Sequence, residues 1–428
     1  MLQLRTVLVV AAVAACVALV LILRPIADDE DVPVVPTPSG ATRGEPVADP
    51  FAWTPERSDE LARRAAAGTS HVLYTRSPGG AVATAERVAP FRPLVERAAE
   101  TAGVSPDLLE ALVFLESGGR PDAQAPGGAE AATGLTQILA ETGQNLLGMK
   151  VDVERSGRYT RRIARATKPK RIAALERARA RVDERFDPAK ALEATARYLT
   201  MAMERFGRED LAFVSYHMGM GNLESVLAAY GAGRRPYAEL YFASTPTRHA
   251  AAYRKLASFG DDSSNYFWKL QAARDIMRVS RADPGELARR AAAHGTDEDG
   301  RRRMLLDGAP QGDLRPLPNA PEDTALTAEP GVELRPEALG VALYMGVKVR
   351  VISQAKALRV TEARDGGWTF LVSRRYASRR QARAFQYVLD RLQVLDVIAW
   401  SRSPRSISVT ASRDAKVLEP LLDRLEDS

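Results

Sequence analysis

The sequence of 428 residues predicts a mainly helical protein with a small α+β domain at its C-terminal end and a transmembrane helix at its N-terminus. Three observations support this prediction. Residues 90–285 contain successive segments with apolar side chains at helical spacing. Residues 334–428 contain short stretches of alternating apolar and polar residues, as in strands. Residues 7–23 form an unbroken apolar run of about the length that spans a bilayer.

The apolar run at residues 7–23 has the properties of a membrane anchor. Arg5 precedes it, Arg24 follows it, and the next segment is acidic. Because the N-terminus is short, we expect a single-pass protein of the cell membrane with its body on the extracytoplasmic side. A cleavable signal peptide is the alternative, although the run is long for one and lacks a small-x-small cleavage site. The only cysteine, Cys16, lies inside the run, so the body is expected to contain no disulfides.

Shifts in composition set the domain boundaries, with Pro-rich linkers on either side of the helical part. We expect an anchor or uncleaved signal at 1–24, a linker at 25–53, an N-terminal extension at 54–89, a helical domain at 90–285, a second linker at 286–333 after a short helix, and an accessory α+β domain at 334–428.

Each region has its own expected elements. In the extension we expect a short helix over 54–67 and a hairpin whose arms, 71–74 and 81–84, flank a Ser-Pro-Gly-Gly turn. The helical domain is expected to contain helices at 91–102, 106–117, 190–206, 211–218, 222–229 and 265–279. The accessory domain is expected to contain strands at 347–351, 368–372 and 406–410 and helices at 379–392 and 418–425.

The helical domain carries a basic insertion near 150–186. Residues 155–185 are polar and strongly basic with few large apolar positions, which predicts an exposed helix or a helical pair. A substrate-gripping arm and a solvated helical face are both compatible with this pattern, and we favour the solvated face. The net charge of +6 likewise favours anionic polymers in principle, but an Arg-rich genome explains it more simply. No nucleic-acid-binding motif is present, so no nucleic-acid partner is expected.

Glu116 is the first candidate functional residue. Ser105 and Pro106 suit the start of a helix and Gly118 suits its end, which predicts a helix over 106–117. Glu116 lies on the apolar face of that helix, with Leu109, Leu112 and Val113. Burial and the negative end of the helix dipole should raise the pKa of its carboxyl group, which suits a proton donor near neutral pH. The alternative is a frayed helix end at which Glu116 pairs with Arg120 in water.

Three motifs in order resemble those of the soluble lytic transglycosylases, which have a lysozyme-like fold. The segment 116–123 is similar to the catalytic motif, 132–138 to the Gly-Leu-Met-Gln segment and 215–222 to the Ala-Tyr-Asn-x-Gly-x-Gly segment of that family. Asp187-Pro188 and the helix after it also match, and Tyr266 corresponds to a late tyrosine of the family. The resemblance covers about 90–279 and implies a mainly α, lysozyme-like catalytic domain.

The resemblance also implies an activity. The expected reaction is cleavage of the MurNAc-β-1,4-GlcNAc bond of peptidoglycan with formation of a 1,6-anhydro-MurNAc end, and Glu116 acts first as general acid and then as base. No cofactor or metal is implied. The alternatives are a muramidase that uses water, and a non-catalytic cell-wall-binding or scaffold protein. A hydrolytic mechanism would gain support if Asp122, Glu130 or Glu141 faced Glu116.

The same motifs supply candidate substrate-binding residues. They are Ser117, Gln137, Tyr216, His217, Gly219 and Tyr266. The chain departs from the family at Thr136, which stands in place of Met, and at His217, which stands in place of Asn. The expected partners are peptidoglycan strands, the membrane through the N-terminal helix, and a cell-wall or divisome protein for the C-terminal domain. The four histidines lie outside that domain, which excludes a His-ligated zinc site there.

Overall fold

The computed structural model describes residues 53–231, 233–244, 249–259 and 262–295, together with six short strands and Val394 further along the chain. The predicted anchor, almost all of the first linker and the predicted helices at 379–392 and 418–425 lie outside these residues. Among the described residues, no helix is both long and apolar enough to cross a membrane.

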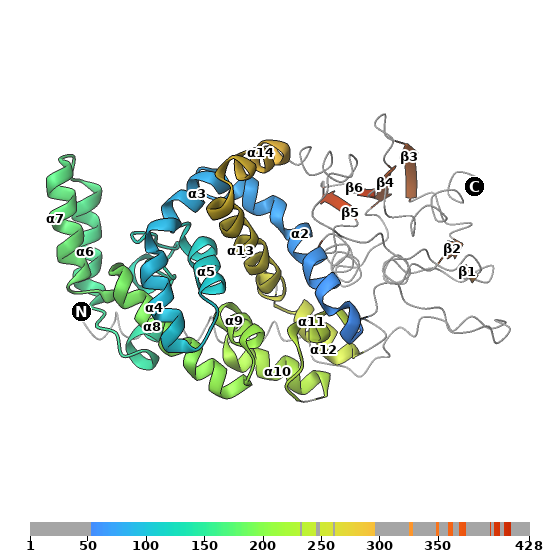
Figure 1. Ribbon diagram of the computed structural model, residues 1–428, viewed down its shortest axis with the longest axis horizontal. Helices are drawn as coiled ribbons and strands as arrows, with labels where there is room; N and C mark the ends of the chain where they lie inside the picture. The colour runs from blue at the N-terminus through green and yellow to red at the C-terminus, as the bar shows by residue number, and fades with distance from the viewer. Residues whose placement is uncertain are drawn as a thin grey trace, which may run out of the picture. The chain divides into compact units, whose positions relative to one another are not determined.

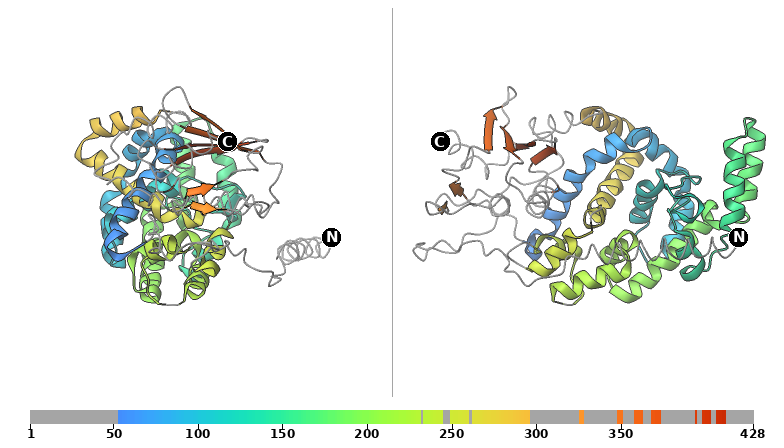
Figure 2. Two further views of the ribbon diagram at one scale, coloured as in Figure 1. Left: turned by 90° about the vertical axis from the view of Figure 1, so that its right-hand side faces the viewer. Right: turned by 180° about the vertical axis from the view of Figure 1, so that it is seen from behind.

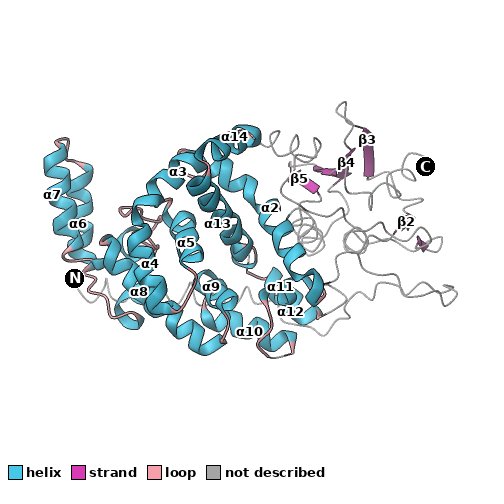
Figure 3. Ribbon diagram, viewed as in Figure 1, coloured by secondary structure: helices cyan, strands magenta, loops and turns pink. Residues whose placement is uncertain are grey.

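The described part of residues 53–295 is mainly helical, as predicted (Figures 1 and 3). Its α-helices are α2 (Ser58–Arg76), α3 (Gly80–Val88), α4 (Arg92–Ala102), α5 (Pro106–Ser117), α6 (Val153–Ala164), α7 (Pro169–Ala180), α8 (Pro188–Phe206), α9 (Glu209–Met218), α10 (Met220–Tyr230), α11 (Tyr237–Phe242), α12 (Ala250–Ala257), α13 (Tyr266–Ala282) and α14 (Pro284–His294). Short turns of other helix types are η1 (Pro55–Arg57), η2 (Ala89–Phe91), η3 (Gly128–Glu130), η4 (Thr142–Leu146), η5 (Glu184–Phe186) and η6 (Asp262–Ser264).

The described strands form two sheets. Strands β1 (Ala325–Thr327) and β2 (Lys348–Arg350) pair in parallel. The other sheet is antiparallel in the order β3-β4-β6-β5, from β3 (Leu358–Glu362), β4 (Trp368–Ser373), β6 (Ser406–Ala411) and β5 (Ile398–Arg402). The three predicted strands correspond to β2, β4 and β6. Strand β1 falls within the segment predicted as a linker, and helix α14 also extends past residue 286 into it.

The predicted hairpin in residues 71–84 is wrong, because both of its arms are helical. Helix α2 continues to Arg76, and α3 begins at Gly80 after the left-handed Gly79. Leu61, Ala65 and Leu73 fall on one buried side of α2 at helical spacing. Short, mostly apolar segments of four residues fit a helix as well as a strand, so packing decided the conformation.

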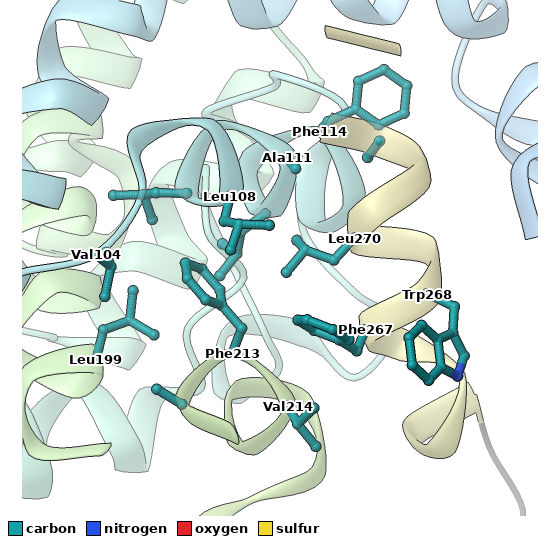
Figure 4. Packing of buried hydrophobic residues seen from close by; sticks show 14 of the residues in the cluster. Val104, Leu108, Ala111, Phe114, Leu199, Phe213, Val214, Phe267, Trp268 and Leu270 are labelled. Atoms are coloured by element: carbon teal, nitrogen blue, oxygen red, sulfur yellow. The ribbon is translucent and has the colours of Figure 1, made fainter. Parts of the chain in front are cut away.

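The core forms around α13, which lies between α2 and α5 (Figure 1). Leu108, Ala111 and Phe114 of α5, Leu270 and Phe267 of α13, and Phe213 and Val214 of α9 pack together, as Figure 4 shows. These side chains are almost completely buried, and each of the larger ones, Ala111 excepted, contributes roughly 1.5–3 kcal/mol through its burial. This packing fixes the C-terminal end of α5 beside the N-terminal end of α13.

The first and last helices of this part also meet. Helix α14 packs on α2 and α3, and the buried rings of His71 and His294 approach with their Nδ1 atoms 3.1 Å apart. His294 also stacks on Tyr74, with ring centroids 4.1 Å apart. The N-terminal extension is therefore continuous with the core of the helical domain.

The basic insertion is a helical pair, one of the two expected forms. Helices α6 and α7 lie side by side and extend away from the other helices (Figures 1 and 2). Most of their arginine and lysine side chains are exposed. Arg179 and Arg185, which belong to the same basic stretch, are buried, so the stretch is more than a solvated face.

A buried ion pair closes the base of the insertion. Arg185 and Asp183 are both fully buried, with Nη2 and Oδ2 2.9 Å apart. The guanidinium also donates to the backbone oxygens of Ala129 at 2.6 Å, Ala131 at 3.0 Å and Ile138 at 3.2 Å. A buried guanidinium is stable only when its donors are satisfied, and three carbonyl groups and a carboxylate satisfy this one. One side chain therefore holds the loop of residues 129–138 in place.

We predict that Arg185→Ala lowers the free energy of unfolding by about 3–5 kcal/mol, because it leaves the buried carboxylate of Asp183 without its cation. Urea denaturation measures this loss. Arg181→Ala, four residues away and exposed, is the matched control and should change stability by less than about 0.5 kcal/mol. Equal, small losses in the two variants would contradict the role given to Arg185.

Candidate active site

The end of α5 that carries Glu116 is tightly fixed. Gly118 and Gly119 follow it with φ of 60° and 73°, values that favour glycine. A Cβ atom on Gly119 would lie 2.8 Å from the backbone of Arg87, so the chain passes too close for any side chain. Arg87 donates from Nε to the Gly118 oxygen at 2.9 Å. The alternative of a frayed end is therefore wrong, and Arg120 donates to the Ser117 oxygen at 3.0 Å and not to Glu116.

Glu116 is half-buried and accepts a hydrogen bond. The Tyr266 hydroxyl donates to Oε1 of Glu116 at 2.7 Å. Desolvation by burial raises the pKa of Glu116 to about 7 from its ordinary value of 4.5, against the smaller, lowering effect of the Tyr266 hydrogen bond. The direction is the one that its position on the apolar face of α5 predicts. A carboxyl group with this pKa exchanges a proton readily at neutral pH.

Tyr266 and His217 join Glu116 from two other helices. Tyr266 begins α13, and its pKa is raised by burial and by the neighbouring charge of Glu116. The His217 ring, near the end of α9, stacks on the Tyr266 ring with centroids 4.7 Å apart and planes 8° from parallel. His217 is exposed, whereas Tyr266 is 5 % exposed. The fold thus brings together three predicted site residues from α5, α9 and α13.

Tyr216 connects α9 to the loop that carries Gln137. Its hydroxyl donates to the Thr136 oxygen at 2.8 Å and lies 3.3 Å from the Thr195 hydroxyl. Its pKa is raised by burial and, to a smaller extent, by the charge of Glu116, so the two side chains are close enough to interact. The resemblance makes Tyr216 a candidate substrate-binding residue. In the structure the hydroxyl is bonded to protein, so Tyr216 fixes the loop.

Gln137 occupies an unusual backbone conformation. Its φ is 52°, in the left-handed region that costs a non-glycine residue about 1–3 kcal/mol. Its amide nitrogen donates to the Gly134 oxygen at 2.8 Å and to the Ala123 oxygen at 3.2 Å. Both of these hydrogen bonds come from the amide nitrogen, and no donor within the described residues reaches Oε1. The half-buried side chain therefore presents its carbonyl oxygen as an acceptor.

The turn before Gln137 is packed against the buried arginine. Gly134 has a φ of 84°, and a Cβ atom there would lie 1.8 Å from the Arg185 oxygen. Only glycine fits this close approach. Thr136 is fully buried, and its hydroxyl has no hydrogen-bond partner among the described residues. The structure therefore gives the Thr136 hydroxyl no role that explains its presence in place of Met.

Two other predicted residues have structural positions. The Ser117 hydroxyl is buried and donates to the Val113 oxygen of its own helix at 3.3 Å. It is therefore engaged within α5. Gly219 joins α9 to α10 with a φ of 85°. No atom lies closer than 3.9 Å to a Cβ placed there, so the backbone angle and not crowding explains this glycine.

The three neighbouring carboxylates do not act on Glu116. Asp122, Glu130 and Glu141 are exposed. The charge of Asp122 acts on Arg179, where it opposes the lowering of the pKa by burial. Within the described ranges, no second carboxylate contributes to the pKa shift of Glu116, and no group of three or more His, Cys, Asp or Glu residues is placed to hold a metal.

A pocket elsewhere in the helical part is separate from this group. It lies between α2, α9, α11 and α13 and is lined by residues that include Ser58, Asp210, Pro236 and Trp268. Glu116 does not line it. Its polar groups are mostly engaged, since Asp210 accepts hydrogen bonds from Arg208 and from the Tyr237 backbone. The candidate active site is therefore the cluster of side chains around Glu116, whose carboxyl group can exchange a proton.

Sequence reasoning missed two arginines that build the site. Arg87 caps the end of α5, and Arg185 holds the loop that carries Gln137. The Asp-x-Arg spacing of Asp183 and Arg185, next to the Asp187-Pro188 helix start, was the available signal. Such a spacing is common on surfaces, so burial could not be inferred from it.

Comparison with known families gives one match. Residues 162–237 match the family model of the transglycosylase SLT domain. This confirms the resemblance to the lytic transglycosylase and lysozyme-like family. The matched segment runs from α6 to the start of α11 and includes Tyr216, His217 and Gly219, whereas Glu116 and Gln137 precede it. No curated protein matches the chain.

The raised pKa of Glu116 predicts a pH-dependent change in stability. The folded state binds this proton more tightly than the unfolded chain, so its contribution is fully present below pH 4.5 and is lost as the pH rises through 7. Glu116→Gln removes the titration. We expect it to raise the free energy of unfolding by about 1–3 kcal/mol at pH 8, and by much less at pH 4.

Denaturant melts of the two proteins at both pH values measure this effect. Glu141→Gln, at an exposed position, is the control and should show no such pH-dependent gain. A Glu116→Gln protein that is destabilised equally at pH 4 and pH 8 would contradict the assignment of the raised pKa.

Proposed function

Because residues 162–237 match a transglycosylase SLT domain, we propose that this protein is a peptidoglycan lytic transglycosylase with Glu116 as its catalytic acid and base. The family match implies an activity of the lytic transglycosylase type on peptidoglycan. The proposed bond is MurNAc-β-1,4-GlcNAc and the proposed product carries a 1,6-anhydro-MurNAc end. The observation that carries the proposal is a half-buried carboxyl group with a pKa of about 7, bonded to Tyr266.

The reaction needs two proton transfers at one residue. Protonated Glu116 donates its proton to the glycosidic oxygen as the bond from that oxygen to C1 breaks. The acetamido group of the same sugar can assist at C1. The C6 hydroxyl oxygen then attacks C1, and its proton passes to the Glu116 carboxylate, which restores the starting state. A pKa near 7 suits both transfers, because neither form of Glu116 is strongly favoured at neutral pH.

Tyr266 stabilises the ionised state of Glu116. When the carboxyl group has given up its proton, the Tyr266 hydroxyl stabilises the anion through the 2.7 Å hydrogen bond. Burial acts in the opposite direction and favours the neutral acid. The balance between these two effects keeps Glu116 able to act as acid and as base.

The remaining site residues divide into two proposed roles. Gln137, with its carbonyl oxygen available, and the exposed His217 are proposed to contact the sugar, as is the backbone at Gly219. Tyr216 and Ser117 are engaged within the protein and are proposed to hold the site in shape. Tyr266 acts on substrate through Glu116.

The absence of a second carboxylate beside Glu116 in the described residues favours the lytic reaction over hydrolysis. An inverting hydrolase needs a base that activates water, and a retaining one needs a carboxylate nucleophile. Asp122, Glu130 and Glu141 are exposed and do not perturb Glu116. A scaffold without activity is disfavoured because a buried, raised-pKa carboxyl group costs stability that a scaffold does not need.

The proposed location follows from the substrate and the sequence. Peptidoglycan lies outside the cytoplasmic membrane, and the apolar run at residues 7–23 has the length of an anchor. We therefore propose a single-pass membrane protein with its catalytic part on the extracytoplasmic side. A cell-wall or divisome protein is proposed as the partner of the C-terminal region.

Glu116→Gln tests the catalytic assignment. The amide can neither donate nor accept the proton, so release of muropeptides from purified sacculi should fall by about 10²-fold or more. Chromatography and mass spectrometry of the products should show 1,6-anhydro ends with the unaltered protein. Glu130→Gln is the matched control and should keep nearly full activity.

Reducing ends in place of anhydro ends would replace the lyase with a hydrolase. Full activity in Glu116→Gln would remove Glu116 from the mechanism. No release by the unaltered protein would favour the scaffold.

Tyr266→Phe tests how Glu116 is tuned. The unaltered enzyme should lose kcat/KM as the pH rises through about 7, because the proton donor is then ionised. Removing the Tyr266 hydroxyl removes an effect that lowers the pKa of Glu116, so this alkaline limb should move to higher pH. Tyr159→Phe, on the insertion, should leave the limb in place. A limb that moves to lower pH in Tyr266→Phe would contradict the proposed tuning.

A further inference from the structure

The helical pair of α6 and α7 carries a large share of the protein's positive charge. We call residues 152–181 the basic arm. The arm contains eleven arginines and lysines and three carboxylates, a net charge of +8, whereas the whole chain carries +6. The positive charge is therefore concentrated on this one projecting element (Figure 2), which an Arg-rich genome does not explain.

Most of the charges on the arm are available to a ligand. Two are engaged at its start, where Arg158 pairs with Glu154 and Arg155 lies 3.9 Å from Asp152. No carboxylate within the described residues lies at ion-pair distance from the following exposed side chains: Arg161, Arg162, Arg165, Lys168, Lys170, Arg171, Arg177 and Arg181. A row of like charges on two short helices is destabilising by itself, so an anionic ligand would relieve it.

The base of the arm is rigidly joined to the site. The Ser156 hydroxyl donates to Asp183 at 2.7 Å, and Val151 forms a bridge with Asp183. Arg179 points inward and covers the Phe186 ring at 3.6 Å. Asp183 in turn holds Arg185, which holds the loop of Gln137. The arm therefore has a fixed position relative to the catalytic group, as a binding element for an extended substrate requires.

The chemistry of the arm selects among polyanions. Binding to a membrane surface would need exposed large apolar side chains, and within the described residues those are Leu139 and Leu146, neither of them on the arm. Binding to single-stranded nucleic acid would need aromatic rings for stacking, and the one aromatic ring of the arm, Tyr159, has Arg162 above it at 5.7 Å. The exposed charges of the arm that have no ion-pair partner among the described residues are cationic, which suits a polymer with separated carboxylates.

We propose that the basic arm binds the carboxylate groups of the peptide stems on peptidoglycan strands, beside the bond that Glu116 cleaves. This inference rests on the proposed function, because peptidoglycan is the polyanion that such an enzyme meets. The stems project from alternate sugars and carry carboxylates, with which the exposed arginines of the arm can form ion pairs. The arm thus gives the enzyme a preference for glycan that still carries its peptides.

The test compares two quadruple variants of the full chain, each made with Glu116→Gln so that nothing is cut. The arm variant carries Arg161→Gln, Arg165→Gln, Arg171→Gln and Arg177→Gln. The control carries the same change at four exposed arginines on other helices: Arg63, Arg97, Arg254 and Arg278. The net charge is thereby equal in the two proteins. Co-sedimentation measures binding to intact peptidoglycan and to the same peptidoglycan after a carbodiimide and ammonia have converted its carboxylates to neutral amides.

We expect the arm variant to bind intact peptidoglycan about tenfold more weakly than the control, and to bind the amidated peptidoglycan as well as the control does. The difference on intact peptidoglycan should shrink as salt is added. Equal binding of the two variants to intact peptidoglycan would overturn the proposal. An equal loss on the amidated peptidoglycan would also overturn it, because the arm would then contact a group other than a carboxylate.

Anionic vesicles and duplex DNA serve as competing ligands in the same assay. If either binds the arm more tightly than intact peptidoglycan does, the arm belongs to a membrane or nucleic-acid site and the proposal fails. Binding needs no cleavage. If the unaltered protein releases no muropeptides, the proposed enzyme activity is wrong. If the arm variant nevertheless binds intact peptidoglycan more weakly than the control, the proposed role of the arm is still supported.

Discussion

The buried pair of Asp183 and Arg185 is the interaction on which the candidate site most depends. Desolvating two charges is costly, and the pair repays that cost only because the guanidinium also meets the backbone oxygens of Ala129, Ala131 and Ile138. Those carbonyl groups belong to the loop of residues 129–138, which contains Gln137. The same carboxylate accepts a hydrogen bond from Ser156 at the start of the basic arm. One ion pair therefore sets the position of a catalytic loop and of a charged arm together.

A second constraint acts on Glu116 from the packing of α5 against α13. The apolar contacts between these helices leave the carboxyl group half-buried and place Tyr266 within hydrogen-bond distance. Burial and the hydrogen bond shift the pKa in opposite directions, and burial has the larger effect. The proton affinity of Glu116 is thus a property of helix packing, whereas the position of Gln137 is a property of buried electrostatics. The Tyr216 hydroxyl connects the two through Thr136.

The sequence was informative where local signals and packing agree. The bounds of α5 were predicted correctly because Pro106, the apolar face and Gly118 all indicate the same helix. The location and raised pKa of Glu116 followed from that face. The predicted hairpin at residues 71–84 was wrong because its short, mostly apolar arms fit a helix as well as a strand. The pairing of Arg185 with three distant carbonyl groups has no local signal, since it depends on chain segments about 50 residues apart.

The contact of α14 with α2 has a consequence for how the protein can be divided. Leu61 near the start of α2 and Leu287 of α14 belong to one continuous core with α5 and α13, and His71 meets His294 across it. The first and last helices of the helical region are thus packed against each other, so the two ends of this region lie together. A fragment that begins at residue 90, where the family resemblance begins, would lack α2 and α3, which form part of this core. The smallest fragment that can fold alone is therefore set by the contact of α14 with α2, and not by the limits of the motifs.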